Sequence, residues 1–202
     1  MMAPTAIRRT ILTGAAMLAL VGCFNEPEPA YKTRHPDALV RLQDRGLREL
    51  PGPLNHEETI YVNLDRNALE KLPEEILKCG KLKWLRLNDN RLKELGDLSA
   101  LKELRRIYLK NNRLTQVPEG IKGLKKLTDV ELSGNPITEV PEWLTEMESL
   151  EKVSLNGTMV TKLPDKLDGW KKLKMLQLGD LRIPAEEMAR IRKALPEVAI
   201  VF

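Results

Sequence analysis

Aliphatic residues recur along the chain at a fixed spacing, with polar residues between them. The plainest copy of this pattern consists of Leu82, Leu85, Leu87, Asn90, Leu92 and Leu95. The alternation at Leu85-Arg86-Leu87 has the two-residue period of a β-strand, so the leucines are expected to point inward and Arg86 outward. Each copy of the pattern therefore predicts one short strand followed by a turn.

The pattern recurs in seven copies, the first of them degraded and the last incomplete. The column that holds Asn90 falls at residues 45, 67, 90, 112, 135, 158 and 181, so the steps are 22, 23, 22, 23, 23 and 23 residues. A period this regular is typical of a repeat architecture. One copy offers about seven apolar side chains worth roughly 1.5–3 kcal/mol each, while ordering its backbone costs about 1–2 kcal/mol per residue. A single copy is therefore unstable, and only a stack of copies can fold.

The repeat resembles the leucine-rich-repeat family, whose pattern is LxxLxLxxNxLxxLPxxLxxLxx, over residues 37–183. The resemblance implies an α/β fold. It is a curved right-handed solenoid of about seven repeats in which each repeat adds one parallel strand to a concave sheet. The family also uses caps over the open edges of the stack. Residues 184–202 are expected to form the C-terminal cap.

The cap is predicted from a change of period after Ile183. Apolar residues first recur at helical spacing and then alternate as in a strand, so a helix followed by a strand is expected. These residues are Met188, Ile191 and Leu195, then Val198, Ile200 and Phe202.

The asparagine column has a structural interpretation. An inward amide can bond the unpaired backbone groups where the chain turns out of the strand. The column is occupied by Asn67, Asn90, Asn112 and Asn135, with Arg45, Thr158 and Leu181 as departures. Cys79 falls in another inward column, where a free cysteine behaves as a small buried hydrophobe.

The first 36 residues have a different character. Arg8 and Arg9 precede an uncharged stretch of 12 residues, 11–22, which is shorter than the about 20 that span a bilayer. This predicts a secretory signal over residues 1–22, exported by the general or the twin-arginine route. Residues 23–36 are rich in proline and charge and are expected to form a tether.

The signal ends in Leu20-Val21-Gly22-Cys23, which resembles the lipobox of bacterial lipoproteins. The resemblance implies that the chain is cleaved before Cys23 and that Cys23 carries lipid on its sulfur and its amine. Several acyl chains anchor a protein stably in a membrane. We therefore expect a protein of the bacterial cell envelope, in the outer membrane or on the cell surface rather than in the inner membrane.

Composition narrows the classes of function. Of the 202 residues 42% are hydrophobic, 31% are charged and only 4% are aromatic, so aliphatic contacts build the core. The formal charge of +4 falls to 4 − 2 = +2 when Arg8 and Arg9 leave with the signal, which gives no reason to expect a nucleic-acid partner. With two cysteines and two histidines, neither a metal site nor a disulfide framework is expected. No cofactor is predicted.

Binding must use the outward strand residues, because the core takes up the leucines. One outward column is Leu39, Tyr61, Trp84, Arg106, Asp129, Lys152 and Met175, and its neighbour is Arg41, Asn63, Arg86, Tyr108, Glu131, Ser154 and Gln177. Aromatic residues beside arginine are typical anchors of protein interfaces, although Tyr and Trp also suit strands whatever they face. The predicted partner-binding residues, on three adjacent strands, are Tyr61, Trp84, Arg86, Arg106, Tyr108 and Lys110.

An enzymatic alternative would use Asp129 and Glu131. Their Cα atoms should lie about 6.6 Å apart on one strand, near the separation of the carboxyl pair in inverting glycosidases. Arg106 and Lys152 flank Asp129, however, and such a charged row should lower carboxylate pKa values, whereas a general acid needs a raised one. We expect no catalytic residues and no enzymatic activity.

Three functions remain open from the sequence. The first is a protein-interaction module of the envelope that binds through the concave face. The second is a structural or self-associating lipoprotein, in which the same face meets its own copy. The third is glycan or peptidoglycan recognition, with Trp84 and Tyr108 as stacking platforms.

Overall fold

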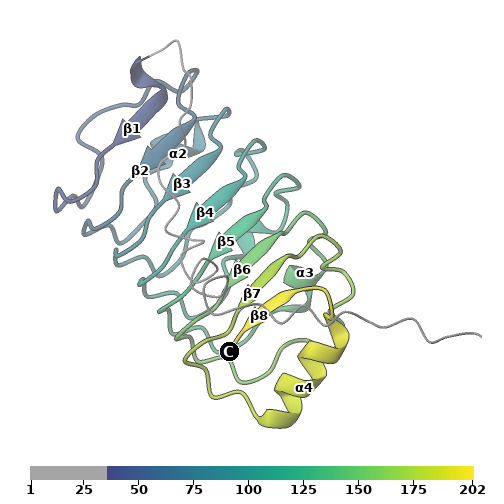
Figure 1. The fold of residues 1–202 in the computed structure, drawn as a ribbon. Helices are drawn as coiled ribbons and strands as arrows, with labels where there is room; N and C mark the ends of the chain where they lie inside the picture. Colours follow the sequence, from purple (N-terminus) through teal and green to yellow (C-terminus); the bar gives the residue numbers. More distant parts are fainter. Residues whose placement is uncertain (1–35) are drawn as a thin grey trace, which may run out of the picture. The chain divides into compact units, whose positions relative to one another are not determined.

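Parallel strands of three residues each build one open sheet in this computed structural model, which describes residues 36–202. Each strand pairs with the strands before and after it in the sequence, so the sheet grows by one strand per repeat (Figure 1). This arrangement confirms the predicted leucine-rich-repeat solenoid. The strands are β1 (Leu39–Arg41), β2 (Tyr61–Asn63), β3 (Trp84–Arg86), β4 (Arg106–Tyr108), β5 (Asp129–Glu131), β6 (Lys152–Ser154), β7 (Met175–Gln177) and β8 (Ala199–Val201).

Helical segments are few and short. Pro73, Pro118 and Pro141 immediately precede α2, η2 and α3, because proline fixes the φ angle that the first turn needs. The longest helix, α4, leads into β8, so the predicted helix and strand of the C-terminal cap are both present. The helical segments are η1 (Pro36–Ala38), α2 (Glu74–Leu77), η2 (Glu119–Ile121), α3 (Glu142–Thr145) and α4 (Ala185–Ala194).

The repeat that begins with β3 differs from the others. It has Gly96 where the other central repeats have proline. No helical segment lies between β3 and β4, as is also the case between β6 and β7. The chain instead packs tightly against the next repeat: a Cβ atom on Gly120 would lie 1.9 Å from the carbonyl oxygen of Gly96. Only glycine fits this approach, so the contact fixes how these two repeats stack.

The core is one continuous column of aliphatic side chains. The middle residues of the central strands, such as Leu85, Ile107 and Val130, are fully buried. Val40 and Ile200 occupy the same position in β1 and β8 but are only half-buried, because each has a neighbouring repeat on one side only. Cys79 is fully buried within this core, as predicted, and burial raises the pKa of its thiol.

The asparagine column forms the predicted hydrogen-bond ladder. The Asn112 side-chain oxygen accepts the backbone N–H of Leu92 at 3.0 Å, and its nitrogen donates to the carbonyls of Leu87 and Leu109 at 2.9 and 3.0 Å. Each amide therefore joins its own repeat to the preceding one. Thr158 makes the shorter substitute that its size allows, a bond to the carbonyl of Leu155 at 2.8 Å.

A second ladder of charged side chains runs along the outside, at the position four residues before the middle of each strand. There Lys81 pairs with Glu58, and Lys126 pairs with Glu103 one repeat apart. Glutamate and lysine alternate over these four repeats. Exposed pairs of this kind contribute little stability each, but their order is regular.

The predictions for the N-terminal region fall outside the described residues. The signal, Cys23 and almost all of the tether belong to residues 1–35, so these assignments stay predictions. Within residues 36–202, no helix is both long and apolar enough to cross a bilayer.

Candidate functional site: the concave face

The parallel register brings the predicted binding residues together. Tyr61 pairs with Trp84 and Trp84 with Arg106, so three consecutive strands supply one row of the concave face. The neighbouring row pairs Arg86 with Tyr108. Lys110 follows two residues after β4. The six residues therefore form one continuous patch over β2–β4. We call its three rings, Tyr61, Trp84 and Tyr108, the aromatic row.

The rings of the aromatic row contact one another. Ring centroids are 6.1 Å apart between Tyr61 and Trp84 and 6.2 Å apart between Trp84 and Tyr108, with tilted planes. The guanidinium carbon of Arg106 lies 4.2 Å from the Trp84 centroid, and that of Arg86 lies 5.1 Å from the Tyr108 centroid. Both distances suit cation–π attraction, and the ring separations suit aromatic pairs.

The rings are buried, which differs from the expectation that they point into solvent. Tyr61 is 0% exposed, Trp84 5% and Tyr108 1%. Contacts within the row contribute to this burial, because each ring is covered on one side by another ring or by a guanidinium. The accessible groups of the patch are its cations: Arg86 and Arg106 are partly exposed and Lys110 is exposed. The rings thus form a buried layer beneath the cations.

Carboxylates orient these cations. Asp65, whose side chain is 2% exposed, accepts a hydrogen bond from Arg86 Nε at 2.7 Å. A charge-assisted bond to a buried carboxylate holds the guanidinium in place above Tyr108. Further along, the Asp129 carboxylate lies 3.7 Å from both Arg106 and Lys152. The alternating row of charges predicted across β4, β5 and β6 is therefore present.

Glu131 does not follow the expected lowering of carboxylate pKa values. Burial raises its pKa, and hydrogen bonds from Ser133 and Ser154 and the charge of Lys110 offset only part of this effect. One carboxylate oxygen accepts the backbone N–H of Ser133 at 2.8 Å, and the Ser133 and Ser154 hydroxyl oxygens are 2.6 Å apart. The expectation failed because it considered the flanking charges and omitted desolvation.

A raised pKa alone does not make this carboxyl group a general acid. Proton donation to a substrate needs a pocket in which the substrate reaches the acid. Two hollows of about 590 and 500 Å³ lie elsewhere: one at residues 93–97 and 114–120, the other beside Lys122, Trp143 and Lys172. Neither is lined by Asp129 or Glu131. Within residues 36–202, no three His, Cys, Asp or Glu side chains gather as a metal site requires.

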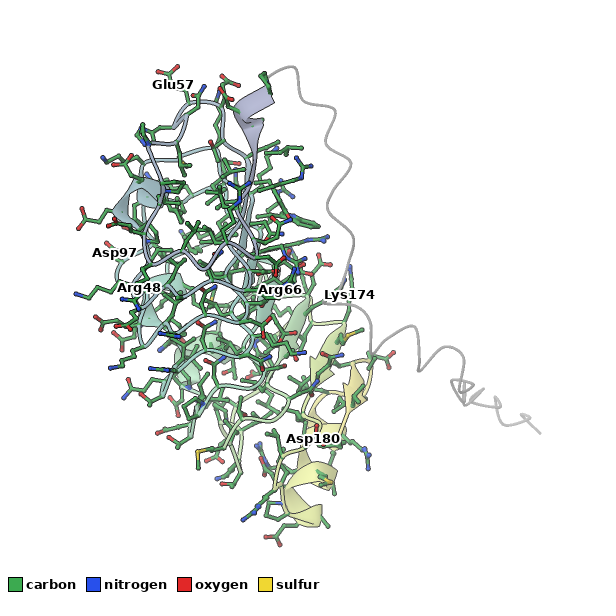
Figure 2. All side chains as sticks on the ribbon, turned by 90° about the vertical axis from the view of Figure 1, so that its left-hand side faces the viewer. Arg48, Glu57, Arg66, Asp97, Lys174 and Asp180 are labelled. Atoms are coloured by element: carbon green, nitrogen blue, oxygen red, sulfur yellow. The ribbon has the colours of Figure 1, made fainter. Side chains whose placement is uncertain are left out.

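A third ladder, which the repeat pattern did not predict, lies at the rim that follows the strands. The Asp65 carboxylate accepts the N–H of Asn88 at 2.8 Å, and the Asn88 side-chain oxygen accepts the N–H of Lys110 at 2.9 Å. The next residue of most repeats has a positive φ angle, as at Arg66 (55°, labelled in Figure 2) and Asp89 (55°). The available signal was the succession of Asp, Asn and Gly there, because these residues adopt that conformation readily.

The repeats of this chain are similar to those of known proteins. A family model described as leucine rich repeat matches residues 59–114, 81–137 and 103–160, which together cover half of the chain. Podocan from Mus musculus is 36% identical over 112 residues, which cover 49% of this chain and 18% of podocan. Keratocan from Bos taurus is 34% identical over 101 residues, which cover 48% of this chain and 26% of keratocan. The chain thus matches only a small part of either relative.

A solved structure gives wider coverage. A leucine-rich-repeat protein from Leptospira interrogans is similar to this chain with a TM-score of 0.61 and 29% sequence identity. The match covers 72% of this chain and 43% of that protein. The similarity therefore extends beyond the central repeats that the family model matches.

Proposed function

We propose that this chain, which belongs to the leucine-rich-repeat family, binds another protein through the concave face over β2–β4. One observation carries the proposal: cations are held in fixed positions above a buried layer of aromatic rings. Arg106 lies over Trp84, and Arg86 is tied to Asp65 above Tyr108. Side chains whose geometry is already fixed lose little conformational entropy on binding, so they favour association. Arginine is also enriched among the residues that dominate interface energies.

The area of the face indicates a binding energy concentrated in few contacts. Eight strands about 4.8 Å apart and about 16 Å of exposed strand length give roughly 540 Å². A standard stable interface covers about 800 Å² per partner. The sheet alone is smaller, so affinity should depend on the oriented cations of the patch and on contacts from the flanking turns.

The aromatic row favours a protein partner over a glycan. Stacking of a sugar on Trp84 or Tyr108 needs an exposed ring face, but these rings are 5% and 1% exposed. The Arg106 guanidinium already lies over Trp84. Recognition through cations and hydrogen bonds is therefore better supported than recognition through ring stacking.

The experiment removes two of the three accessible cations and keeps Arg86 and the rings. Crosslinking from native membranes should identify the partner, and the purified partner should bind Arg106→Ala/Lys110→Ala at least about tenfold more weakly than the parent protein. A matched control is Lys102→Ala/Lys125→Ala, which removes two exposed cations from the turns between strands. Equal partner affinity of the parent and the concave variant would exclude this face as the site.

We also propose that the protein works as a lipid-anchored component of the bacterial cell envelope, at the outer membrane or cell surface. The support is the Leu20-Val21-Gly22-Cys23 motif after a short apolar stretch. Mass spectrometry of membrane-extracted protein should find acyl mass on Cys23, and Cys23→Ser should release the protein or leave its signal uncleaved. An unmodified Cys23 at this position of the mature protein would refute the anchor and leave the concave-face proposal intact.

A further inference from the structure

Strand β8 leaves one edge of the sheet unpaired within residues 36–202. Its other edge pairs with β7: the N–H of Ala199 donates to Lys174 at 2.9 Å, and the carbonyl of Val201 accepts from Leu178 at 2.7 Å. Successive residues of a strand present their N–H and C=O groups to opposite sides. The N–H and C=O groups of Ile200 therefore point away from β7, toward the next position in the sheet.

This edge carries neither of the residue types that usually protect edge strands. Such edges carry charged side chains, proline or a bulge that prevents pairing with another chain. Residues 198–202 are Val-Ala-Ile-Val-Phe, five apolar residues without a charge or a proline, and all five are half-buried. The opposite edge strand, β1, carries the exposed Arg41 and follows Pro36. The two edges thus differ, and β8 is the one suited to pairing.

We infer that β8 pairs antiparallel with β8 of a second copy of this chain, about a two-fold axis that passes beside Ile200. In this register Ile200 faces Ile200 of the second copy, and the two exchange both N–H···O bonds. Ala199 then faces Val201 of the second copy, and Val198 faces Phe202. A two-fold interface must be self-complementary, and an uncharged strand centred on Ile200 meets this condition.

Charges beside the strand support a second copy as the occupant. The guanidinium carbon of Arg192 lies 4.7 Å from the Phe202 ring centroid, and Phe202 would face Val198 of the other copy. Glu197 precedes Val198, and both Arg192 and Glu197 are exposed. The antiparallel register therefore brings the strand end that carries Arg192 in each copy next to the strand end that carries Glu197 in the other, so opposite rather than like charges flank the paired strands.

The pairing would have a consequence for binding. It would join two sheets into one sheet of sixteen strands, because each copy contributes the eight strands of its own solenoid. The aromatic row lies on β2–β4, several strands away from β8, so both concave patches would remain accessible. A partner with two binding segments could then engage both copies and gain affinity through effective concentration.

The test uses charges that meet only in this register. Ala199 and Val201 point to the concave face, so substituting them spares the inward column. In Ala199→Lys/Val201→Lys, each lysine would face a lysine of the second copy. In Ala199→Lys/Val201→Glu, each lysine would face a glutamate. Like charges directly opposite destabilise strand pairs, and opposite charges stabilise them.

Sedimentation velocity of the purified full chain over a range of concentrations measures the effect. The parent protein should show a reversible monomer–dimer equilibrium. The lysine pair should raise the dimer Kd about tenfold, and the lysine–glutamate pair should restore it. Thermal melts of both variants verify folding. A parent that stays monomeric throughout, a lysine pair that dimerises like the parent, or a lysine–glutamate pair that does not recover would overturn the inference.

Discussion

Two rows of side chains cross the solenoid from strand to strand, and both are buried, but they differ in what they contact. The amide of Asn112 bonds backbone groups of two successive repeats. Trp84, in the aromatic row, contacts the side chains of Tyr61, Tyr108 and Arg106. Burial alone therefore does not separate a row that bonds the backbone from a row whose side chains contact one another. The distinction lies in whether removing a side chain leaves backbone groups unpaired or leaves only a gap.

Replacing Trp84 by alanine tests the packing side of this comparison and should have the largest effect. The ring is 5% exposed and lies between two other rings, so its loss leaves a cavity. Loss of a buried tryptophan costs about 3–5 kcal/mol of stability, and we expect the lower end on a sheet face. Urea denaturation measures it, with Trp84→Phe as a milder control. An unchanged midpoint would show that the ring contributes no packing.

Replacing Asn112 by alanine tests the hydrogen-bonding side. The substitution leaves the N–H of Leu92 and the carbonyls of Leu87 and Leu109 without their amide partner. An unsatisfied buried group costs about 1–3 kcal/mol, so the protein should lose stability with little change in packing. Thr158→Ala, which removes a hydroxyl bonded to one carbonyl, should cost less in the same denaturation experiment. Equal losses would contradict the bridging role of the amide.

Replacing Glu131 by glutamine should have the smallest effect, and its sign depends on pH. Burial raises the pKa of Glu131 above 4.5 in the folded protein, so folding favours the protonated carboxyl group. The parent should therefore lose stability as pH rises through the folded-state pKa, while the glutamine variant should not. Melts from acidic to neutral pH should show the variant gaining relative to the parent. A constant difference across this range would refute the raised pKa.

Most of the fold could be predicted because equivalent positions of successive repeats lie side by side in the sheet. Alternation around Leu85 assigns β3, and the step of 22 or 23 residues transfers that assignment to the other strands of β1–β7, while β8 was predicted from the alternation within the cap. The asparagine ladder was also predictable, since an inward amide at a turn has few other roles. Gly96 departs from the proline of the pattern, but this residue does not decide whether a helical segment forms, because the repeat that begins with β6 keeps Pro164 and also lacks one.

The burial of the concave side chains, and its effect on the pKa of Glu131, were harder to predict. The alternation places Trp84 and Glu131 on the outer face, but it does not say whether neighbouring repeats cover them. Ring contacts across three strands and desolvation of Glu131 both depend on neighbouring repeats, as the contact between Trp84 and Tyr108 shows. A pattern read one repeat at a time omits such contacts. The ladder from Asp65 to Asn88 was missed for the same reason.

The alternating Glu–Lys ladder gives this part of the protein a period of two repeats rather than one. Its charge pattern recurs over two repeats: Glu58 to Glu103 and Lys81 to Lys126 are each 45 residues apart. Inserting or deleting one repeat within residues 58–126 would place two lysines or two glutamates side by side. Gain or loss of two repeats together would keep every pair. The double repeat is therefore the unit whose duplication preserves the charge order of this segment.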